Sequence, residues 1–164
     1  MDAYEAVITK RDTRSSTAEP VSGDDLGKIL QAGRMAGSAK NAQLTRLVVV
    51  TDAEQRRRLT ECGDFTSWIA IAPVIIVLAM PVEDGRLFDV GRMAQNMMIV
   101  ANSLGLGTCP VTFQHQDRVR AVLGMPEHME ARHAITLGHR GEEPINPLRA
   151  PRVAVEELVH RDRW

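Results

Sequence analysis

The sequence contains little cysteine, few aromatic residues and almost no net charge. Only two of its 164 residues are cysteines, Cys62 and Cys109. Two cysteines provide neither a disulfide framework nor a metal-ligand spacing, so we expect a reducing compartment, the cytoplasm. The 20 basic and 21 acidic residues give a net charge of -1, and this balance gives no reason to expect a nucleic acid or an anionic membrane as a partner.

Long hydrophobic runs are also missing. The most apolar stretch, residues 68–80, is too short to span a membrane and contains Pro73. The N-terminus carries acidic residues and begins at once with helical periodicity, so we expect no signal peptide. The pattern G-x-S-x-G is absent, and no two histidines lie four residues apart on an expected helix, which argues against a serine nucleophile and a metal site. A hydrophobic fraction of 44% is typical of a globular protein, and residues 1–164 fit one domain.

The strongest pattern is an expected helix at residues 89–104. Its apolar residues recur at three- and four-residue steps, Asp89 is a suitable N-cap, and Gly105 stands where a helix ends in the left-handed conformation. The apolar positions cover more than one face of this helix. It is therefore expected either to be a core helix against a sheet or to be shared with a second subunit.

Short helices and strands alternate along the rest of the chain. We interpret the arginine run at residues 56–58 as exposed surface charge, and the continuous apolar run at 73–79 as a strand covered on both faces. This succession predicts a sheet with helices on both sides, a three-layer α/β or α+β architecture. The expected helices are 4–10, 24–36, 53–59, 89–104 and 115–123. The expected strands are 47–51, 73–79, 131–138 and one that follows a glycine turn within 105–113. Residues 153–159 have strand character and could add a strand to the edge of a partner's sheet.

Cations and amides gather in a few polar segments. Lys10, Arg11 and Arg14 form an early cluster, and an amide-rich loop follows at residues 38–43. Guanidinium groups and hydroxyls suit a phosphate, although each segment taken alone is equally compatible with a solvated loop. Together with the glycine turn at residues 105–108, they suggest a phosphorylated, planar cofactor.

Six segments in order resemble the FMN-dependent nitroreductase family over essentially the whole chain. They are KRDTR, AGSAKNAQ, DVGRMAQNMMIVANSLGLGT, LGMPE, ITLGHRGEE and RVAVEELVHRDRW. The resemblance implies an α+β, three-layer α-β-α sandwich with a mixed, mainly antiparallel sheet. It also implies a homodimer with FMN at the interface, an interface helix at about 89–104, and a C-terminal segment, about 140–164, that wraps the partner.

The resemblance also implies which residues bind FMN, while the flavin N5 atom carries the chemistry and no protein residue is catalytic. An early group meets the phosphate and ribityl chain, Ser38 reaches the partner's FMN, two amides approach the ring or ribityl chain, and a backbone stretch lies near the N5 edge. One of two late arginines meets the phosphate. The expected cofactor-binding residues are Lys10, Arg11, Asp12, Thr13, Arg14, Ser38, Asn41, Gln43, Pro110, Val111, Thr112, Arg149 and Arg152.

Three departures from the family pattern stand out. Gly37 replaces a proline, and Leu44 and Thr45 replace a proline–tryptophan pair. The connection at residues 80–87 is short where many members insert helices that cover the flavin, which suggests an open site. Asp12 stands where serine is common, and its carboxylate would be repelled by a phosphate unless it faces away.

The resemblance implies an oxidoreductase that passes hydride from NAD(P)H through FMN to a small, electron-poor acceptor such as a nitroaromatic or a quinone, by a ping-pong mechanism. Two alternatives stay open. One is a flavin-fragmenting enzyme of the same superfamily, because KRDTR also resembles the motif of that branch. The other is a flavin-binding dimer without catalysis, because the covering segment is missing.

Overall fold

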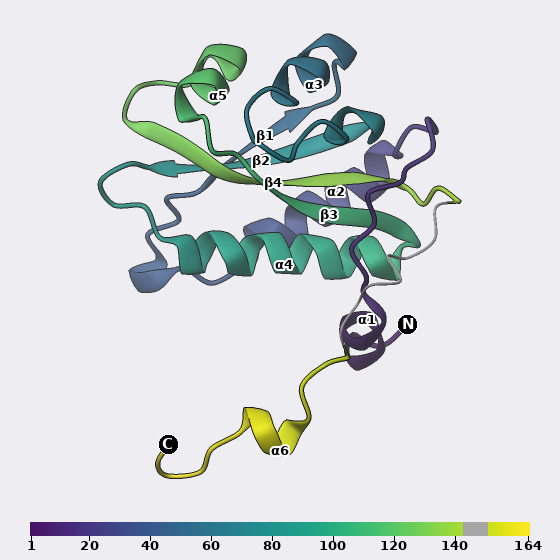
Figure 1. Ribbon diagram of the computed structural model, residues 1–164, viewed down its shortest axis with the longest axis vertical. Coiled ribbons are helices and arrows are strands. Elements are labelled where there is room, and N and C mark those ends of the chain that lie inside the picture. Colours follow the sequence, from purple (N-terminus) through teal and green to yellow (C-terminus); the bar gives the residue numbers. More distant parts are fainter. Residues whose placement is uncertain (143–150) are drawn as a thin grey trace.

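The computed structural model describes residues 1–142 and 151–164. The succession of elements confirms the expected order of helices and strands up to residue 139 (Figure 1). The elements are α1 (Ala3–Thr9), α2 (Gly23–Arg34), the 3-10 turn η1 (Ala39–Asn41), β1 (Arg46–Val50), α3 (Ala53–Leu59), η2 (Ile69–Ile71), β2 (Val74–Pro81), α4 (Leu87–Ser103), β3 (Leu106–Thr112), α5 (Gln116–Leu123), β4 (Met129–His139) and α6 (Val155–Leu158).

The four strands form one sheet in the order β1-β2-β4-β3. All three strand pairs are antiparallel, and an isolated bridge between Asp12 and Thr108 is parallel. The central strand β2 is buried along almost its whole length, which explains why its sequence is continuously apolar rather than alternating. The α+β class is thereby confirmed.

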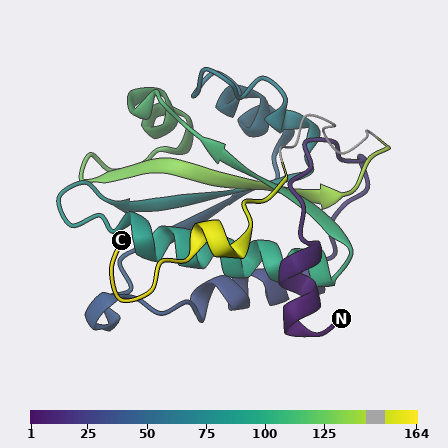
Figure 2. The same ribbon diagram turned by 60° about the horizontal axis from the view of Figure 1, so that its bottom comes forward.

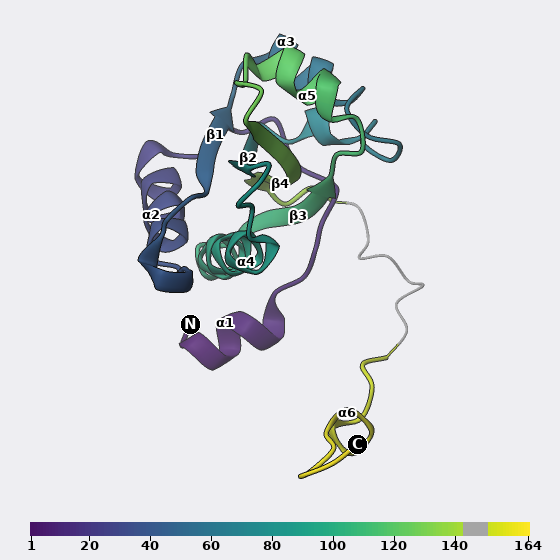
Figure 3. The same ribbon diagram turned by 90° about the vertical axis from the view of Figure 1, so that its left-hand side faces the viewer.

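Helices cover both faces of the sheet, as expected for three layers. On one face, α2 and α4 pack against Ile76 and Leu78 of β2 through Ile29 and Met97. On the other face, α3, α5 and η2 pack against the alternate residues of β2 (Figures 1 and 3). Because side chains alternate across a strand, β2 supplies both hydrophobic clusters.

The long helix α4 agrees with its prediction at one end and differs at the other. Gly105 has φ 81°, so the helix ends in the left-handed conformation, as predicted. Asp89 is not the N-cap: α4 begins at Leu87, after Arg86. The Asp89 carboxylate instead accepts a hydrogen bond from the backbone N–H of Ala39 (3.1 Å), a contact with a loop that is distant in sequence.

The arginine run at residues 56–58 is only partly surface charge. Arg56 is half-buried and donates hydrogen bonds to the carbonyl oxygens of Ala70 (2.7 Å) and Ala72 (2.6 Å). A guanidinium has five N–H donors, so one side chain can hold several carbonyls of a neighbouring turn. The interpretation as exposed surface charge is wrong for Arg56.

The C-terminal residues 151–164 lie apart from the rest of the described chain and are exposed (Figures 1 and 3). The predicted strand at 153–159 is wrong, because Val155–Leu158 is a single helical turn. Within one chain this segment has no neighbouring strand among the described residues, and its backbone forms local hydrogen bonds, such as Leu158 N–H to Ala154 O (3.0 Å).

Of the helices in the described ranges, none combines the length and hydropathy that a membrane span requires.

Candidate functional site

The segment of residues 10–17 leaves α1 and runs along the ends of β3 and β4. The N–H of Thr13 donates to the Thr108 carbonyl (2.9 Å), and the N–H of Thr17 donates to the His139 carbonyl (2.9 Å). Gly107 permits this close approach, because a Cβ at that position would lie 2.4 Å from Thr13 Cγ2. The fold therefore fixes the early cation cluster at one edge of the sheet.

The three cations of this segment have different surroundings. The Lys10 ammonium pairs with the Asp12 carboxylate, which offsets part of the repulsion that a phosphate would otherwise meet there. Arg11 Nη1 donates to the carbonyls of Ile8 (2.7 Å) and Lys10 (2.8 Å) at the end of α1. The Arg14 guanidinium lies over the ring of Trp68, 5.2 Å from its centroid, and pairs with no carboxylate in the described part of the chain.

Arg14 lines a cavity of about 260 Å³ beside the end of β3. Cys109 lies next to this strand end, and burial raises the pKa of its thiol while Arg14 and Lys10 offset part of that effect. The thiol therefore stays neutral at pH 7 and contributes as a small buried group. The cavity is lined by Arg14, Phe65, Thr66, Trp68, Pro110, Val111, Thr112 and Gln114.

The amide-rich loop at residues 38–43 is held in a strained conformation. Ser38 Oγ accepts a hydrogen bond from the N–H of Gln43 (3.0 Å), and Arg86 Nη1 donates to the Ala39 carbonyl (2.7 Å). Lys40, Asn41 and Gln43 all have positive φ, between 50° and 55°. Such conformations in residues other than glycine gather at functional sites, where the surroundings enforce them.

Ser38 and Gln43 line a second cavity of about 200 Å³ at the start of α4. The guanidinium groups of Arg34 and Arg46 and the carboxylate of Asp89 lie around the same cavity. It therefore offers hydroxyl, amide and charged groups in one place, and its chemistry suits a polar ligand.

Helix α4 contacts both the loop of residues 38–43 and the end of α1, which leads into the cation cluster. Asp89, near its start, contacts the loop of residues 38–43, whereas Asn102, near its end, donates to the Thr9 hydroxyl (3.0 Å) just before the cation cluster. At 1.5 Å per residue the two anchor points lie roughly 20 Å apart. Figure 2 shows α1, in purple, at one end of α4 and the blue loop that contains residues 38–43 at the other end. One chain therefore does not bring the two groups of predicted residues together.

Comparisons with known proteins agree with this fold. A sequence model of the nitroreductase family matches residues 7–62 and 66–139. This chain belongs to the nitroreductase family. It is 26% identical over 182 residues to the NADPH-flavin oxidoreductase of Vibrio harveyi, covering 99% of this chain and 75% of that protein.

Solved structures of family members have the same fold. The crystal structure of the V. harveyi NADPH:FMN oxidoreductase complexed with NAD+ superposes with a TM-score of 0.87 at 26% identity, over 99% of this chain and 77% of that one. A protein from Parabacteroides distasonis, described as a putative NADH dehydrogenase/NAD(P)H nitroreductase, gives a TM-score of 0.88 at 20% identity, over 99% and 98% of the two chains. At 20% identity, the likeness to the P. distasonis protein shows the fold alone.

The predicted site residues of this nitroreductase-family chain fall into separate groups. Arg14, Pro110, Val111 and Thr112 line the cavity beside β3, and residues 10–13 adjoin it. Ser38, Asn41 and Gln43 lie in the loop at the far end of α4. Arg152 is exposed in the C-terminal segment, and Arg149 lies outside the described residues.

Sequence reasoning missed Phe65, Thr66, Trp68 and Gln114 in the lining of the cavity beside β3, and Arg140 beside the cation cluster. Phe65 and Trp68 are two of only six aromatic residues in the chain, and this rarity was the available signal. Arg140 follows β4 and donates to Asn102 Oδ1, beside the cation cluster. No cluster of three or more potential metal ligands occurs among residues 1–142 and 151–164.

Proposed function

We propose that this chain is an FMN-dependent oxidoreductase that passes hydride from NAD(P)H to a small, electron-poor acceptor, a nitroaromatic or a quinone. The observation that carries the proposal is Arg14, a cation without a carboxylate partner in the described residues, on the wall of the cavity beside β3. The names of the relatives support the same chemistry, since they include NADPH-flavin oxidoreductase and FMN reductase [NAD(P)H].

The residues around this cavity fit FMN. Arg14 and the polar segment before it would hold the phosphate, because charge-assisted hydrogen bonds from guanidinium groups are strong. The backbone and side chains of residues 110–112 would line the ring. Bound there, FMN would supply the hydride acceptor and donor. The protein's own contribution is to bind and orient the flavin and its substrates, which explains why no protein acid or base stands out.

We further propose that a second copy of the chain completes each site and that the C-terminal segment, about 140–164, wraps that copy. The separation along α4 of the loop of residues 38–43 from the start of the cation cluster supports a site composed from two chains. Exposed apolar side chains support a covered surface: Phe88 on α4 is 78% exposed, Tyr4 on α1 is 74% exposed and Leu158 in α6 is 70% exposed. Each becomes buried if a partner packs there.

A ping-pong reaction follows from the open cavity, because NAD(P)H and the acceptor would use the same place in turn. The connection between β2 and α4 consists of residues 82–86 alone, so it adds no helix over the site. We also place the protein in the cytoplasm, since Cys62 and Cys109 are both free thiols.

The test is a visible absorption spectrum of the protein loaded with FMN, recorded without oxygen before and after NADH or NADPH. We expect the flavin band to bleach with at least one of the two and to return when a quinone is added. A protein that fails to bind FMN, or that binds it and stays coloured with both reductants, would contradict the proposal. FMN that is consumed irreversibly in oxygen would instead indicate fragmentation.

A further inference from the structure

One large aromatic ring at the rim of the cavity beside β3 is almost free of protein contacts. Phe65 is 79% exposed, yet it lines the same cavity as Arg14. It belongs to the loop of residues 60–68, between α3 and η2. A ring this exposed gains little for folding, so its position calls for another explanation.

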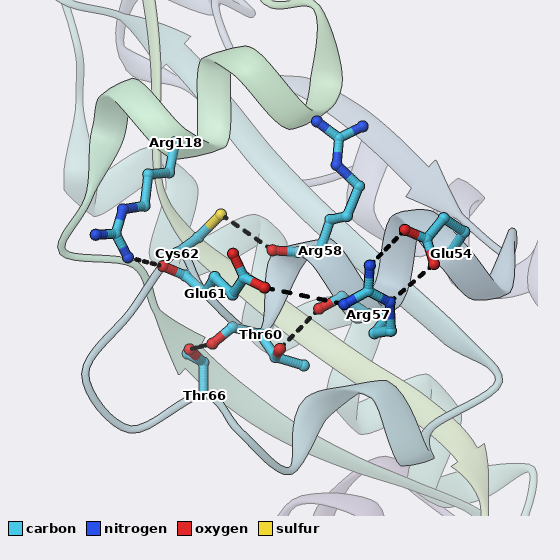
Figure 4. A network of polar contacts seen from close by, with 8 residues as sticks. All are labelled: Glu54, Arg57, Arg58, Thr60, Glu61, Cys62, Thr66 and Arg118. Atoms are coloured by element: carbon cyan, nitrogen blue, oxygen red, sulfur yellow. Dashed lines mark hydrogen bonds and ion pairs between the residues drawn. The ribbon is translucent and has the colours of Figure 1, made fainter.

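The loop that carries Phe65 is rigidly attached to α3 and α5 (Figure 4). The Thr66 hydroxyl lies within hydrogen-bond distance of the carbonyls of both Thr60 (2.7 Å) and Gly63 (2.8 Å), although Thr66 is almost fully buried. Arg118 of α5 donates to the Glu61 carbonyl (2.9 Å). These contacts fix the backbone on both sides of Phe65.

The turn is also fastened to the segment that follows β3. The N–H of Asp64 donates to Gln114 Oε1 (3.0 Å), and the Asp64 carboxylate lies 2.9 Å from His115 Nε2. Gly63 fits so tightly that a Cβ there would lie 2.8 Å from the Thr112 carbonyl. The exposed ring is therefore carried by fixed backbone and not by a loose loop.

Trp68 connects this ring to the expected phosphate site. Its indole N–H donates to the Phe65 carbonyl (2.9 Å), while its ring lies under the Arg14 guanidinium. Arg56 holds the following turn through Ala70 and Ala72. Phe65 and Trp68 thus both line the cavity, and the ring of Trp68 also contacts the Arg14 guanidinium.

We propose that Phe65 is the surface on which a flat aromatic acceptor stacks, and that the loop of residues 60–68 serves as the wall of a site that no helix between β2 and α4 covers. A fixed aromatic ring suits this role because it offers a large contact area with little loss of conformational entropy. The substrate class is a planar, electron-poor ring system, such as a fused-ring quinone. This inference rests on the proposed oxidoreductase function.

The test compares acceptors in the FMN-loaded protein with saturating NADPH or NADH. The acceptors are menadione, a planar quinone, and ferricyanide, a small anion that has no ring to stack. We expect Phe65→Leu to lower kcat/KM for menadione roughly tenfold, whereas Phe65→Tyr keeps it within about twofold, because only the first variant loses the ring. Neither variant should change kcat/KM for ferricyanide.

The outcomes separate this inference from the proposed function. If Phe65→Leu lowers kcat/KM for both acceptors equally, or for neither, Phe65 does not stack the acceptor and the inference is wrong. Anaerobic bleaching of the wild-type flavin reports the proposed function independently, and if bleaching fails the inference fails with it. The melting temperature of each variant should equal that of the wild type, because Phe65 is 79% exposed. FMN affinity is measured for each variant and the assays are run at saturating FMN, because Phe65 lines the cavity proposed for the flavin.

Discussion

A composite site predicts that two damaged chains can restore one another. The first variant is Arg14→Ala, which removes the cation from the cavity beside β3. The second combines Asn41→Ala with Gln43→Ala in the loop at the far end of α4, where both side chains are exposed. Each homodimer then lacks the same half of both sites. A heterodimer of the two variants has one site with both lesions and one site with none.

The expected recovery of FMN binding and activity in the heterodimer follows from the geometry of α4. The loop is anchored at Asp89 and the cation cluster near Asn102, roughly 20 Å apart along the helix, so one chain does not supply both groups to one ligand. In a two-fold symmetric dimer both interfaces are equivalent, and the heterodimer should therefore recover about half of the wild-type FMN stoichiometry and activity. Either homodimer should bind FMN weakly.

The assay uses two affinity tags, one on each variant, and purifies the heterodimer by both tags in turn. Bound FMN is measured from the flavin absorbance, and activity from NAD(P)H oxidation with menadione. A doubly tagged wild-type dimer is the control. If the heterodimer binds no more FMN than either parent, each site lies within one chain and the reasoning from α4 is wrong. A chain that stays monomeric on gel filtration would refute it as well.

Three further predictions concern single residues. Arg14→Ala should weaken FMN binding by about 1.5–3 kcal/mol, roughly 10- to 100-fold in Kd by fluorescence titration, because a charge-assisted phosphate contact is lost. Gly107→Ala should lower the free energy of unfolding by about 1–3 kcal/mol in urea, since its Cβ would lie 2.4 Å from Thr13 Cγ2. Burial, and then the charge of Arg132, lower the pKa of His133 below its usual 6.5. The folded state therefore binds a proton less readily than the unfolded state, so stability is highest above about pH 6.5 and falls as the pH drops through that value; His133→Gln should flatten this slope.

Each of these three predictions would be contradicted by one clear result. Unchanged FMN affinity in Arg14→Ala would remove Arg14 from the phosphate site. A Gly107→Ala protein as stable as the wild type would mean that Thr13 moves aside at no cost. Urea midpoints of wild type and His133→Gln that run in parallel between pH 5 and pH 7 would show that another group causes any pH dependence.

Local patterns predicted the elements wherever the deciding contacts lie close together in the sequence. Gly105 ends α4 because the left-handed conformation suits glycine. The continuous apolar run of β2 predicted its burial on both faces. At Gly105 the local backbone settles the conformation, whereas the burial of β2 can be predicted from its composition although distant segments cover it.

Predictions failed where a distant segment competes for the same group. Asp89 has the chemistry of an N-cap, but its carboxylate is used by the N–H of Ala39, 50 residues earlier. Arg56 was expected in solvent, but carbonyls of a turn that comes later in the chain accept its donors. The cavity wall at Phe65 and Trp68 depends in the same way on Gln114 and Arg118, and no spacing in the sequence reports those contacts.

The same competition explains how the loop of residues 38–43 tolerates Gly37 where the family has proline. A proline at position 37 would restrict the backbone of the unfolded chain, whereas glycine leaves it free to adopt more conformations. Tertiary contacts supply it instead, because the Asp89 carboxylate and the Arg86 guanidinium hold Ala39 from both sides. A Cβ at position 37 would lie 2.5 Å from Arg92 Nη2, the far end of a flexible side chain that can move aside. The loop therefore keeps its strained conformation through α4, the helix that also fixes its distance from the cation cluster.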